Sequence, residues 1–384
     1  MKQIPPTAVV RRAWWWPYLA VTALVLSLVA TKWDRQTGFT SLLRFGDHWH
    51  ALRLPVLQPL PVAKAEGSGG YDGQFYAQLA VDPLLRAPEL KQSLDGPEYR
   101  ARRIFMPWVA ALLGFNRPWW TLQIFALLNV AAWVVVAWLL RREIADDSGC
   151  GLARWSACVL SLGAMESVRQ SLVDLPALAL TLWAVSALRG GRLRRSMLIW
   201  PLAVLTKETA MISVGAVQGW PMRQPGAIRR TAIGLMLAAL PLALWLVYVD
   251  ARLGHSSGSG LPGNFDWPGL ALSAQVTGWV GQLTQGDWSD RAVYALIGVV
   301  ALAVQGVVVV RQWQPESIWW RIGVAHVALM LVLGEWVWSG YWAGARALLP
   351  LTVAFNLLLP AGRGFWPLWI AGNLSLVHGL FRFL

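Results

Sequence analysis

The stretch PWWTLQIFALLNVAAWVVVAWLL, residues 118–140, decides the fold class, because it contains no Asp, Glu, Lys or Arg. A helix needs about 20 predominantly apolar residues to cross the hydrocarbon core of a bilayer. Uncharged runs of similar length recur at 13–31, 231–249, 292–310 and 365–381. We therefore expect an all-α polytopic membrane protein.

The composition agrees with this fold class. Hydrophobic residues make up 56% of the 384 residues and charged residues 14%, and many of the 26 Trp lie at the ends of the apolar runs. Indole rings at these positions suit the headgroup region of a membrane. The formal net charge of +13 comes from basic residues scattered over connectors and not from one stripe. We interpret it as a sign of topology and expect no nucleic-acid partner.

The basic connectors also predict the orientation. Arg141 and Arg142 follow one span and Arg229 and Arg230 precede another, and the positive-inside rule places such loops in the cytoplasm. No small-x-small cleavage site follows residues 13–31, so we expect a retained first span and a cytoplasmic N-terminus. About eleven spans fit the pattern. They are expected at 13–31, 119–140, 152–166, 172–188, 196–206, 209–222, 231–249, 291–310, 322–338, 346–360 and 366–382.

Five parts follow from these spans. Residues 34–118 are too polar and proline-rich to cross, so we expect a long external loop with short interfacial helices, one of them in the apolar stretch 104–115. The second external loop, 250–290, is rich in Gly and Ser at 254–265 and is either a mobile lid or a spacer. The predicted parts are 1–33 with the first span, the loop 34–118, 119–249 with spans two to seven, the loop 250–290, and 291–384 with the last four spans.

The stretch YDGQFYAQLA, residues 71–80, places an acid in the first external loop. If the chain is helical from Asp72, this carboxylate shares a face with Phe75, Tyr76 and Leu79, which dock the helix. One interpretation is that Asp72 caps the helix. The other is a general base, whose pKa partial burial would raise.

These residues carry a family resemblance. Tyr71-Asp72-Gly73-Gln74-Phe75-Tyr76 resembles an aromatic-acid element of the GT-C superfamily of membrane glycosyltransferases, and among these it is similar to the glycosylphosphatidylinositol mannosyltransferases and their bacterial relatives. Three further elements resemble the family in order along the chain. They are Arg102-Arg103-Ile104-Phe105-Met106-Pro107, Leu205-Thr206-Lys207-Glu208-Thr209 and Arg346-Ala347-Leu348-Leu349-Pro350-Leu351. Asp174 with Pro176 resembles an acid-proline element of several members.

The resemblance implies an inverting glycosyltransferase of the bacterial-type plasma membrane, with its site on the extracytoplasmic face. The donor would be a polyprenyl-phosphate sugar, with a mannose-like hexose favoured, and the acceptor a lipid, a glycan or a protein. Asp72 would be the catalytic base. The expected phosphate-binding residues are Arg102, Arg103, Lys207 and Arg346, and the expected pocket residues are Tyr71, Gln74, Tyr76, Asp174 and Glu208.

Alternatives stay open for several of these residues. The family's acid comes soon after the first span, and Asp47 lies nearer to it than Asp72, so Asp47 is the alternative base. His48 and His50 beside Asp47 are a weak metal signal, and the sequence demands neither a metal nor a cofactor.

The charged residues near the spans also have structural interpretations. Lys207 and Glu208 interrupt two apolar segments, so they are either functional or an ion pair at a helix break. Arg346 could reach the outer headgroups, and Asp174 could cap the fourth span.

A second class of function is a transporter or flippase for a lipid-linked sugar. It would need polar residues spread through the spans. Here the charged residues gather at the predicted outer ends instead, which favours an enzyme at the membrane surface.

Overall fold

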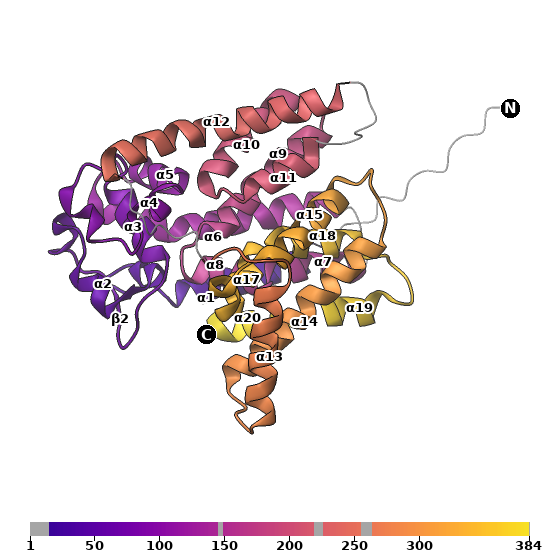
Figure 1. Ribbon diagram of the computed structural model, residues 1–384. Helices are drawn as coiled ribbons and strands as arrows, with labels where there is room; N and C mark the ends of the chain where they lie inside the picture. Colours follow the sequence, from indigo (N-terminus) through magenta and orange to yellow (C-terminus); the bar gives the residue numbers. More distant parts are fainter. Residues whose placement is uncertain (1–14, 145–148, 219–225, 255–262, 384) are drawn as a thin grey trace.

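The computed structural model describes residues 15–144, 149–218, 226–254 and 263–383, which are predominantly helical (Figure 1). The predicted all-α class is confirmed. Strand pairing in these ranges is limited to short pieces, the longest of which are β1 (Phe45–Gly46) and β2 (Lys64–Ala65), which pair in parallel. Arg11 and Arg12 before the first span and residues 255–262 of the predicted lid or spacer lie outside the described residues.

The loop predicted to be external, residues 34–118 and called the external segment below, is a cluster of short elements at the left of Figure 1. The predicted helix from Asp72 is α3 (Gly73–Val81), and its residues 73–80 are all buried. The predicted helix in 104–115 is α5 (Phe105–Leu113). The other elements are η1 (Thr40–Leu43), β1, α2 (Asp47–Ala51), η2 (Pro55–Leu57), β2, η3 (Pro88–Lys91) and α4 (Pro97–Ala101).

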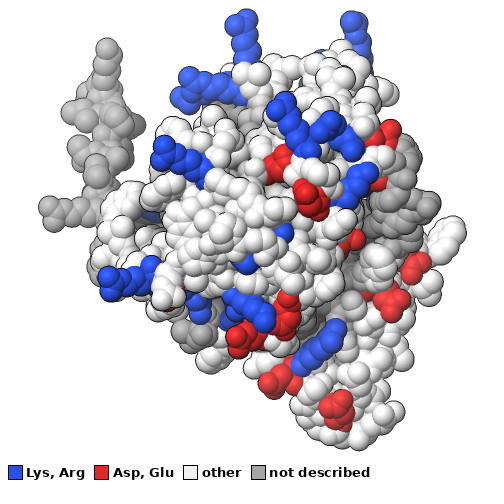
Figure 2. Space-filling view, turned by 90° about the vertical axis from the view of Figure 1, so that its left-hand side faces the viewer, with Lys and Arg blue, Asp and Glu red and all other residues white. Residues whose placement is uncertain are grey.

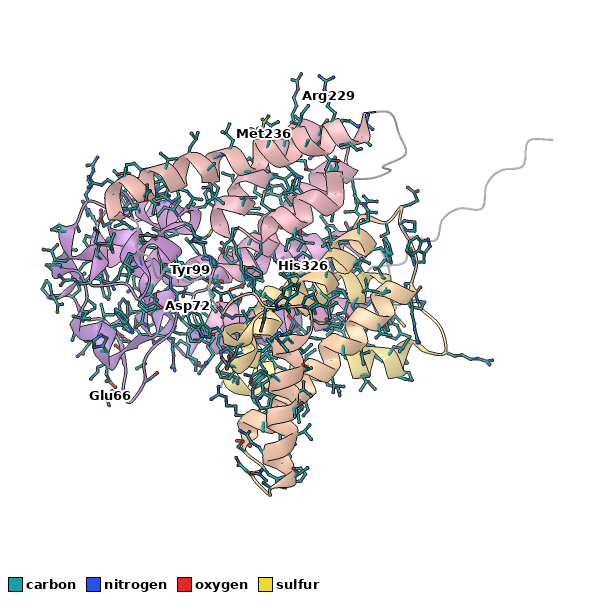
Figure 3. The ribbon with its side chains drawn as sticks, viewed as in Figure 1. Glu66, Asp72, Tyr99, Arg229, Met236 and His326 are labelled. Atoms are coloured by element: carbon teal, nitrogen blue, oxygen red, sulfur yellow. The ribbon has the colours of Figure 1, made fainter. Side chains whose placement is uncertain are left out.

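Three described helices are long and apolar enough to cross a membrane: α6 (Pro118–Glu143), α12 (Ala227–Leu253) and α14 (Asp290–Arg311). A fourth crossing results if α8 (Leu162–Arg169) and α9 (Asp174–Arg189), bent by 120°, count as one span. Most of α12 is unburied, and Met236 and Arg229 project away from the bundle (Figure 3). An apolar helix surface of this kind suits contact with lipid.

Several predicted spans are broken in the structure. The stretches 152–166, 322–338, 346–360 and 366–382 each contain parts of two helices, because Ser161, Gly334 and Asn373 interrupt the helical ladder and Leu348 separates two more helices. Hydropathy averages over a window and does not detect such breaks. The helices concerned are α7 (Gly149–Val159), α8, α15 (Ile318–Val332), α16 (Glu335–Ser339), α17 (Tyr341–Ala347), α18 (Leu349–Leu358), α19 (Phe365–Gly372) and α20 (Leu376–Phe383).

One of the remaining described helices lies in the second predicted loop. The second predicted loop, 250–290, is helical over residues 270–284, where α13 projects from the bundle (Figure 1). The prediction of a lid or a spacer for this loop did not include a helix. The remaining bounds are α1 (Trp16–Ala30), α10 (Leu193–Thr206), α11 (Ala210–Gln218) and α13 (Leu270–Thr284).

The C-terminal ends of α6 and α9, which both have Arg in the last turn, lie together. Glu143 at the end of α6 forms an ion pair with Arg189 at the end of α9, and it accepts a hydrogen bond from Trp319 Nε1 at 2.8 Å. Arg141 lies over the ring of Tyr18, with 4.8 Å to the ring centroid. The ends of α1, α6, α9 and α15 therefore meet at one place.

The face that carries the external segment is mixed in charge. Lys and Arg side chains lie beside Asp and Glu, with broad uncharged areas between them (Figure 2). A nucleic-acid interface would present a continuous basic surface. This face has no such surface.

Candidate active site

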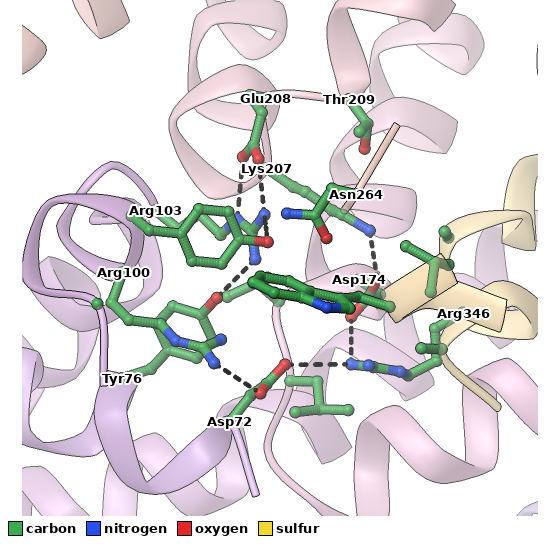
Figure 4. A pocket seen from close by; sticks show the side chains of 18 of the residues that line it. Asp72, Tyr76, Arg100, Arg103, Asp174, Lys207, Glu208, Thr209, Asn264 and Arg346 are labelled. Carbon is green, nitrogen blue, oxygen red and sulfur yellow. Dashed lines mark hydrogen bonds and ion pairs between the residues drawn. The ribbon is translucent and has the colours of Figure 1, made fainter. Parts of the chain in front are cut away.

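A cavity of about 410 Å³ lies where the external segment meets the helix bundle (Figures 3 and 4). Five parts of the chain supply charged groups to it: the start of α3, the segment 95–103 around α4, the start of α9, the break between α10 and α11, and α17. The connectors flanking α13 and α15 supply uncharged groups. Its described charged lining residues are Asp72, Asp95, Arg100, Arg103, Asp174, Lys207, Glu208 and Arg346.

Asp72 is the predicted base, and it lies inside this cavity. Its carboxylate is 3.0 Å from Arg100 Nη2 and 3.8 Å from Arg346 Nη1, and 26% of its side chain is exposed. Within the described chain the Asp72 side chain makes no capping hydrogen bond to α3, although the residue occupies the N-cap position. The capping interpretation is therefore wrong, and the carboxylate faces cations instead.

The predicted direction of the Asp72 pKa is also wrong. Burial by itself raises the pKa of this carboxyl group, but the positive charges of Arg100 and Arg346 outweigh it and hold the pKa below its ordinary value of 3.8. The prediction from the sequence included the burial of Asp72 but not the charges of Arg100 and Arg346. Asp72 is thus a carboxylate at neutral pH and can accept a proton.

The packing around Gly73 explains why a glycine follows Asp72. A Cβ atom at this position would lie 2.2 Å from the carbonyl oxygen of Gln170, closer than any real contact. The missing side chain lets the first turn of α3 pack directly against the turn before α9. This close approach brings Asp72 near Asp174.

Asp174, Lys207 and Arg346 form the second part of the site. Lys207 Nζ forms an ion pair with one carboxylate oxygen of Asp174, and Arg346 Nη1 lies 3.2 Å from the other. Arg346 is buried and points into the cavity, so its interpretation as a headgroup anchor is wrong. Asp174 is the first residue of α9, and its carboxylate bonds to these two cations.

Glu208 and Arg103 form the third part. Arg103 Nη2 and Nε reach the two carboxylate oxygens of Glu208 at 2.6 and 2.9 Å. Arg103 also donates to the hydroxyls of Tyr76 and Tyr99, at 2.8 and 2.9 Å. Lys207 and Glu208 form no described pair with each other, but each forms an ion pair with another residue, as the structural interpretation of ion pairing at a helix break also allows. Adjacent residues at a helix break point in different directions.

Three predicted site residues lie outside the described lining of the cavity. Arg102 places its guanidinium over the ring of Tyr99, 5.2 Å from the centroid. Gln74 is fully buried and accepts a hydrogen bond from Gly46 N at 3.0 Å, so it holds the external segment together.

Asp47 is the third of these residues. It forms an ion pair with Lys64 at 2.7 Å on the exposed side of the external segment. His50 beside it has its Nε2 atom 3.2 Å from the carbonyl oxygen of Val62. In the described ranges, no group of three or more His, Cys, Asp and Glu side chains could hold a metal ion.

Arg100 is a site residue that sequence reasoning missed. It forms ion pairs with both Asp72 and Asp95. Arg100 lies in α4, which ends at Ala101, and Arg103 follows the helix, so no helical periodicity links the two arginines in the sequence. Both line the cavity, whereas Arg102 lies outside its described lining.

One wall of the cavity is apolar, and it too was missed. Phe265 pairs with Leu333 in an antiparallel bridge, and Trp336 N donates to the Gly263 carbonyl at 3.1 Å. The side chains of Phe265, Leu333, Trp336 and Val337 line the cavity. An isolated bridge has no periodic pattern that a sequence could reveal.

Comparisons of the chain with protein family models, with curated proteins and with solved structures found no match.

Proposed function

We propose that this protein is an inverting membrane glycosyltransferase of GT-C type, which moves a sugar from a polyprenyl-phosphate donor to an acceptor hydroxyl. The observation that carries the proposal is the accessible carboxylate of Asp72 in a cavity that also holds four cations and an apolar wall. The cavity volume of about 410 Å³ lies within the range of ligand sites, roughly 300–1,000 Å³.

The charge distribution in the cavity supports an anionic donor. Lys207 and Arg346 both contact the carboxylate of Asp174, so two cations lie side by side at this end of the cavity. Arg346 also lies close to Asp72, which links the cationic end to the base. A phosphate at Lys207 and Arg346 would gain charge-assisted hydrogen bonds. The apolar wall around Trp336 suits the first part of a prenyl tail.

In the proposed reaction, Asp72 accepts the proton of an acceptor hydroxyl while that oxygen bonds to the anomeric carbon. The bond from this carbon to the phosphate oxygen breaks, and polyprenyl phosphate leaves with the electron pair. Glycoside hydrolases use a second carboxyl group to protonate a poor leaving group, whereas a phosphate leaves as an anion. Lys207 and Arg346 would neutralise the charge that grows on it. Attack opposite to the leaving group inverts the anomeric configuration.

The proposed topology has about eleven spans, in which the paired short helices complete single crossings. The common location of the basic ends of α6 and α9 supports a cytoplasmic side there. The external segment and the cavity would then lie on the extracytoplasmic face of a bacterial-type plasma membrane. A mannose-like hexose as the sugar rests on the family resemblance alone, and the acceptor is a lipid, a glycan or a protein.

The test is release of free polyprenyl phosphate from a panel of polyprenyl-phosphate sugars by the purified protein, with membrane extract as the source of acceptor. We expect release from one donor by the wild type and none above background by Asp72→Asn. Donor binding and thermal unfolding of the variant show whether its site is still folded.

Two results would contradict the proposal. One is undiminished transfer by Asp72→Asn. The other is a lack of release from every donor while a labelled lipid-linked sugar crosses proteoliposome membranes, which would favour the flippase.

A further inference from the structure

The hydroxyl of Tyr71 has an unusual set of partners. It accepts a hydrogen bond from Trp342 Nε1 at 2.8 Å and another from Arg346 Nη2 at 2.9 Å. Both donors come from α17, where positions i and i+4 lie on one face of the helix. Tyr71 immediately precedes Asp72 and lines the same cavity.

These two donors determine which further hydrogen bond the Tyr71 hydroxyl can make. An indole N–H and a guanidinium N–H can only donate, so Tyr71 Oη must be the acceptor in both bonds. A phenol oxygen has two lone pairs, and both are used. The O–H hydrogen remains, and among the residues that the structure describes it has no acceptor.

The hydroxyl keeps this hydrogen over the physiological range. Burial raises the pKa of Tyr71 to about 12, although the charge of Arg346 acts in the opposite direction. The group is therefore a neutral donor beside the guanidinium of Arg346.

We propose that the Tyr71 hydroxyl is a fixed hydrogen-bond donor to an anionic ligand oxygen of the phosphate class, and that Trp342 and Arg382 are positioning residues that hold it in this role. The chemical class of the ligand rests on the proposed function. The direction of the hydrogen bond rests on the donor count alone.

The positioning residues connect the C-terminal helix to the site. The guanidinium of Arg382, in α20, lies 4.4 Å from the ring centroid of Trp342. Its Nε forms an ion pair at 2.6 Å with Glu166 in α8, whose side chain is 1% exposed. Glu166 thus fixes Arg382, Arg382 covers the indole, and the indole N–H occupies one lone pair of Tyr71.

The first test is binding of farnesyl phosphate and of farnesol to the purified full-length protein, measured by calorimetry in detergent. A hydrogen bond to a charged acceptor corresponds to about tenfold or more in affinity. We expect Tyr71→Phe to weaken farnesyl phosphate binding by this factor and to leave farnesol unchanged. The matched control is Tyr248→Phe, which removes a hydroxyl that donates to the Leu84 carbonyl and lies outside the described lining of the cavity. Equal affinities of Tyr71→Phe and the wild type for farnesyl phosphate would overturn the proposal.

The second test is a double-mutant cycle. Trp342→Phe removes the N–H, so the hydroxyl is free to turn, and we expect a smaller loss of farnesyl phosphate affinity than in Tyr71→Phe. In the Tyr71→Phe background the same change should have no further effect, because the group it positions is already absent. Arg382→Lys should bind farnesyl phosphate better than Arg382→Ala. Additive losses would show ordinary structural damage and refute the positioning role.

Turnover separates this inference from the proposed function. If farnesyl phosphate binding responds as expected and no donor releases its sugar, the proposed function fails and the inference stands. If sugar is transferred and Tyr71→Phe binds farnesyl phosphate as the wild type does, the inference fails alone.

Discussion

The external segment has two sides that both contain an acid beside a base. On the outer side, near Glu66, Asp47 pairs with Lys64, and 44% of the Asp47 side chain is exposed (Figure 3). On the inner side, Asp72 lies against the helix bundle and contacts Arg100 and Arg346. Asp47 directly follows β1, and its partner Lys64 lies in β2, which pairs with β1. Arg346 reaches Asp72 from the other end of the chain.

The difference between the two sites shows which surroundings make an acid in this protein a candidate base. An exposed ion pair is screened by water and contributes little. Inside the cavity, the charges of Arg100 and Arg346 act on Asp72 at short range with less screening by water. They therefore set the ionisation of Asp72 and the orientation of its partners. The resemblance to a family motif and the distance from the first span did not separate the two acids, whereas their surroundings do.

The largest expected effect is on turnover. Asp72→Asn removes the proton acceptor, and general-base catalysis contributes about 10²–10⁴-fold in rate. We expect a loss of at least about a hundredfold in the initial rate of polyprenyl phosphate release. Asp47→Asn, the same chemical change on the outer side, should leave the rate unchanged. A large loss in Asp47→Asn would reverse the comparison.

The next effect is on stability. Arg103→Ala leaves Glu208 and two tyrosine hydroxyls without their cation in a mostly buried place. Breaking a buried ion pair from one side costs about 3–5 kcal/mol of unfolding free energy. We expect a clear drop in the thermal unfolding midpoint in detergent. Lys64→Ala on the outer side should not change it, and equal midpoints for both variants would contradict this view.

A third effect tests the packing of the YDG turn. Gly73→Ala places a methyl group against the Gln170 carbonyl, and overpacking of this kind costs about 1–3 kcal/mol. We expect a lower unfolding midpoint and slower transfer, because Asp72 must shift. Gly69→Ala is the control, since a Cβ there meets nothing within 4 Å. The explanation fails if the two variants behave alike.

The smallest effect concerns pH. The pKa of Asp72 lies below 3.8, so the active carboxylate is populated above it and is lost only as the pH falls through that lower value. We expect Asp72 to contribute no acidic decline in transfer rate between about pH 5 and 8. Arg100→Gln removes one cation and should move the acidic limb to higher pH. Lys64→Gln should not move it, and a shared shift would point to a general charge effect.

The sequence was sufficient for several parts of this description. Uncharged runs such as 118–140 predicted a helical membrane protein, and α6, α12 and α14 have the required length. The sequence also indicates Asp72, Lys207, Glu208 and Arg346 as candidate site residues. All four line one cavity.

Other parts could not be predicted from the sequence. Its patterns did not reveal the partners of Lys207 and Glu208 or the apolar wall around Trp336. They also did not predict that Gln74 lies outside the described lining of the cavity or that helix breaks interrupt four spans. Each depends on which segments meet in space. Local patterns of hydropathy and spacing contain no information on such meetings.

The sequence by itself determined the class of protein, because the need to bury about 20 apolar residues in a membrane is a property of each segment alone. Only the tertiary structure decided which carboxylate is the candidate base and in which direction its pKa moves. The charges that act on Asp72 belong to Arg100 and Arg346, and their effect depends on distance and burial, which exist only after the chain has folded.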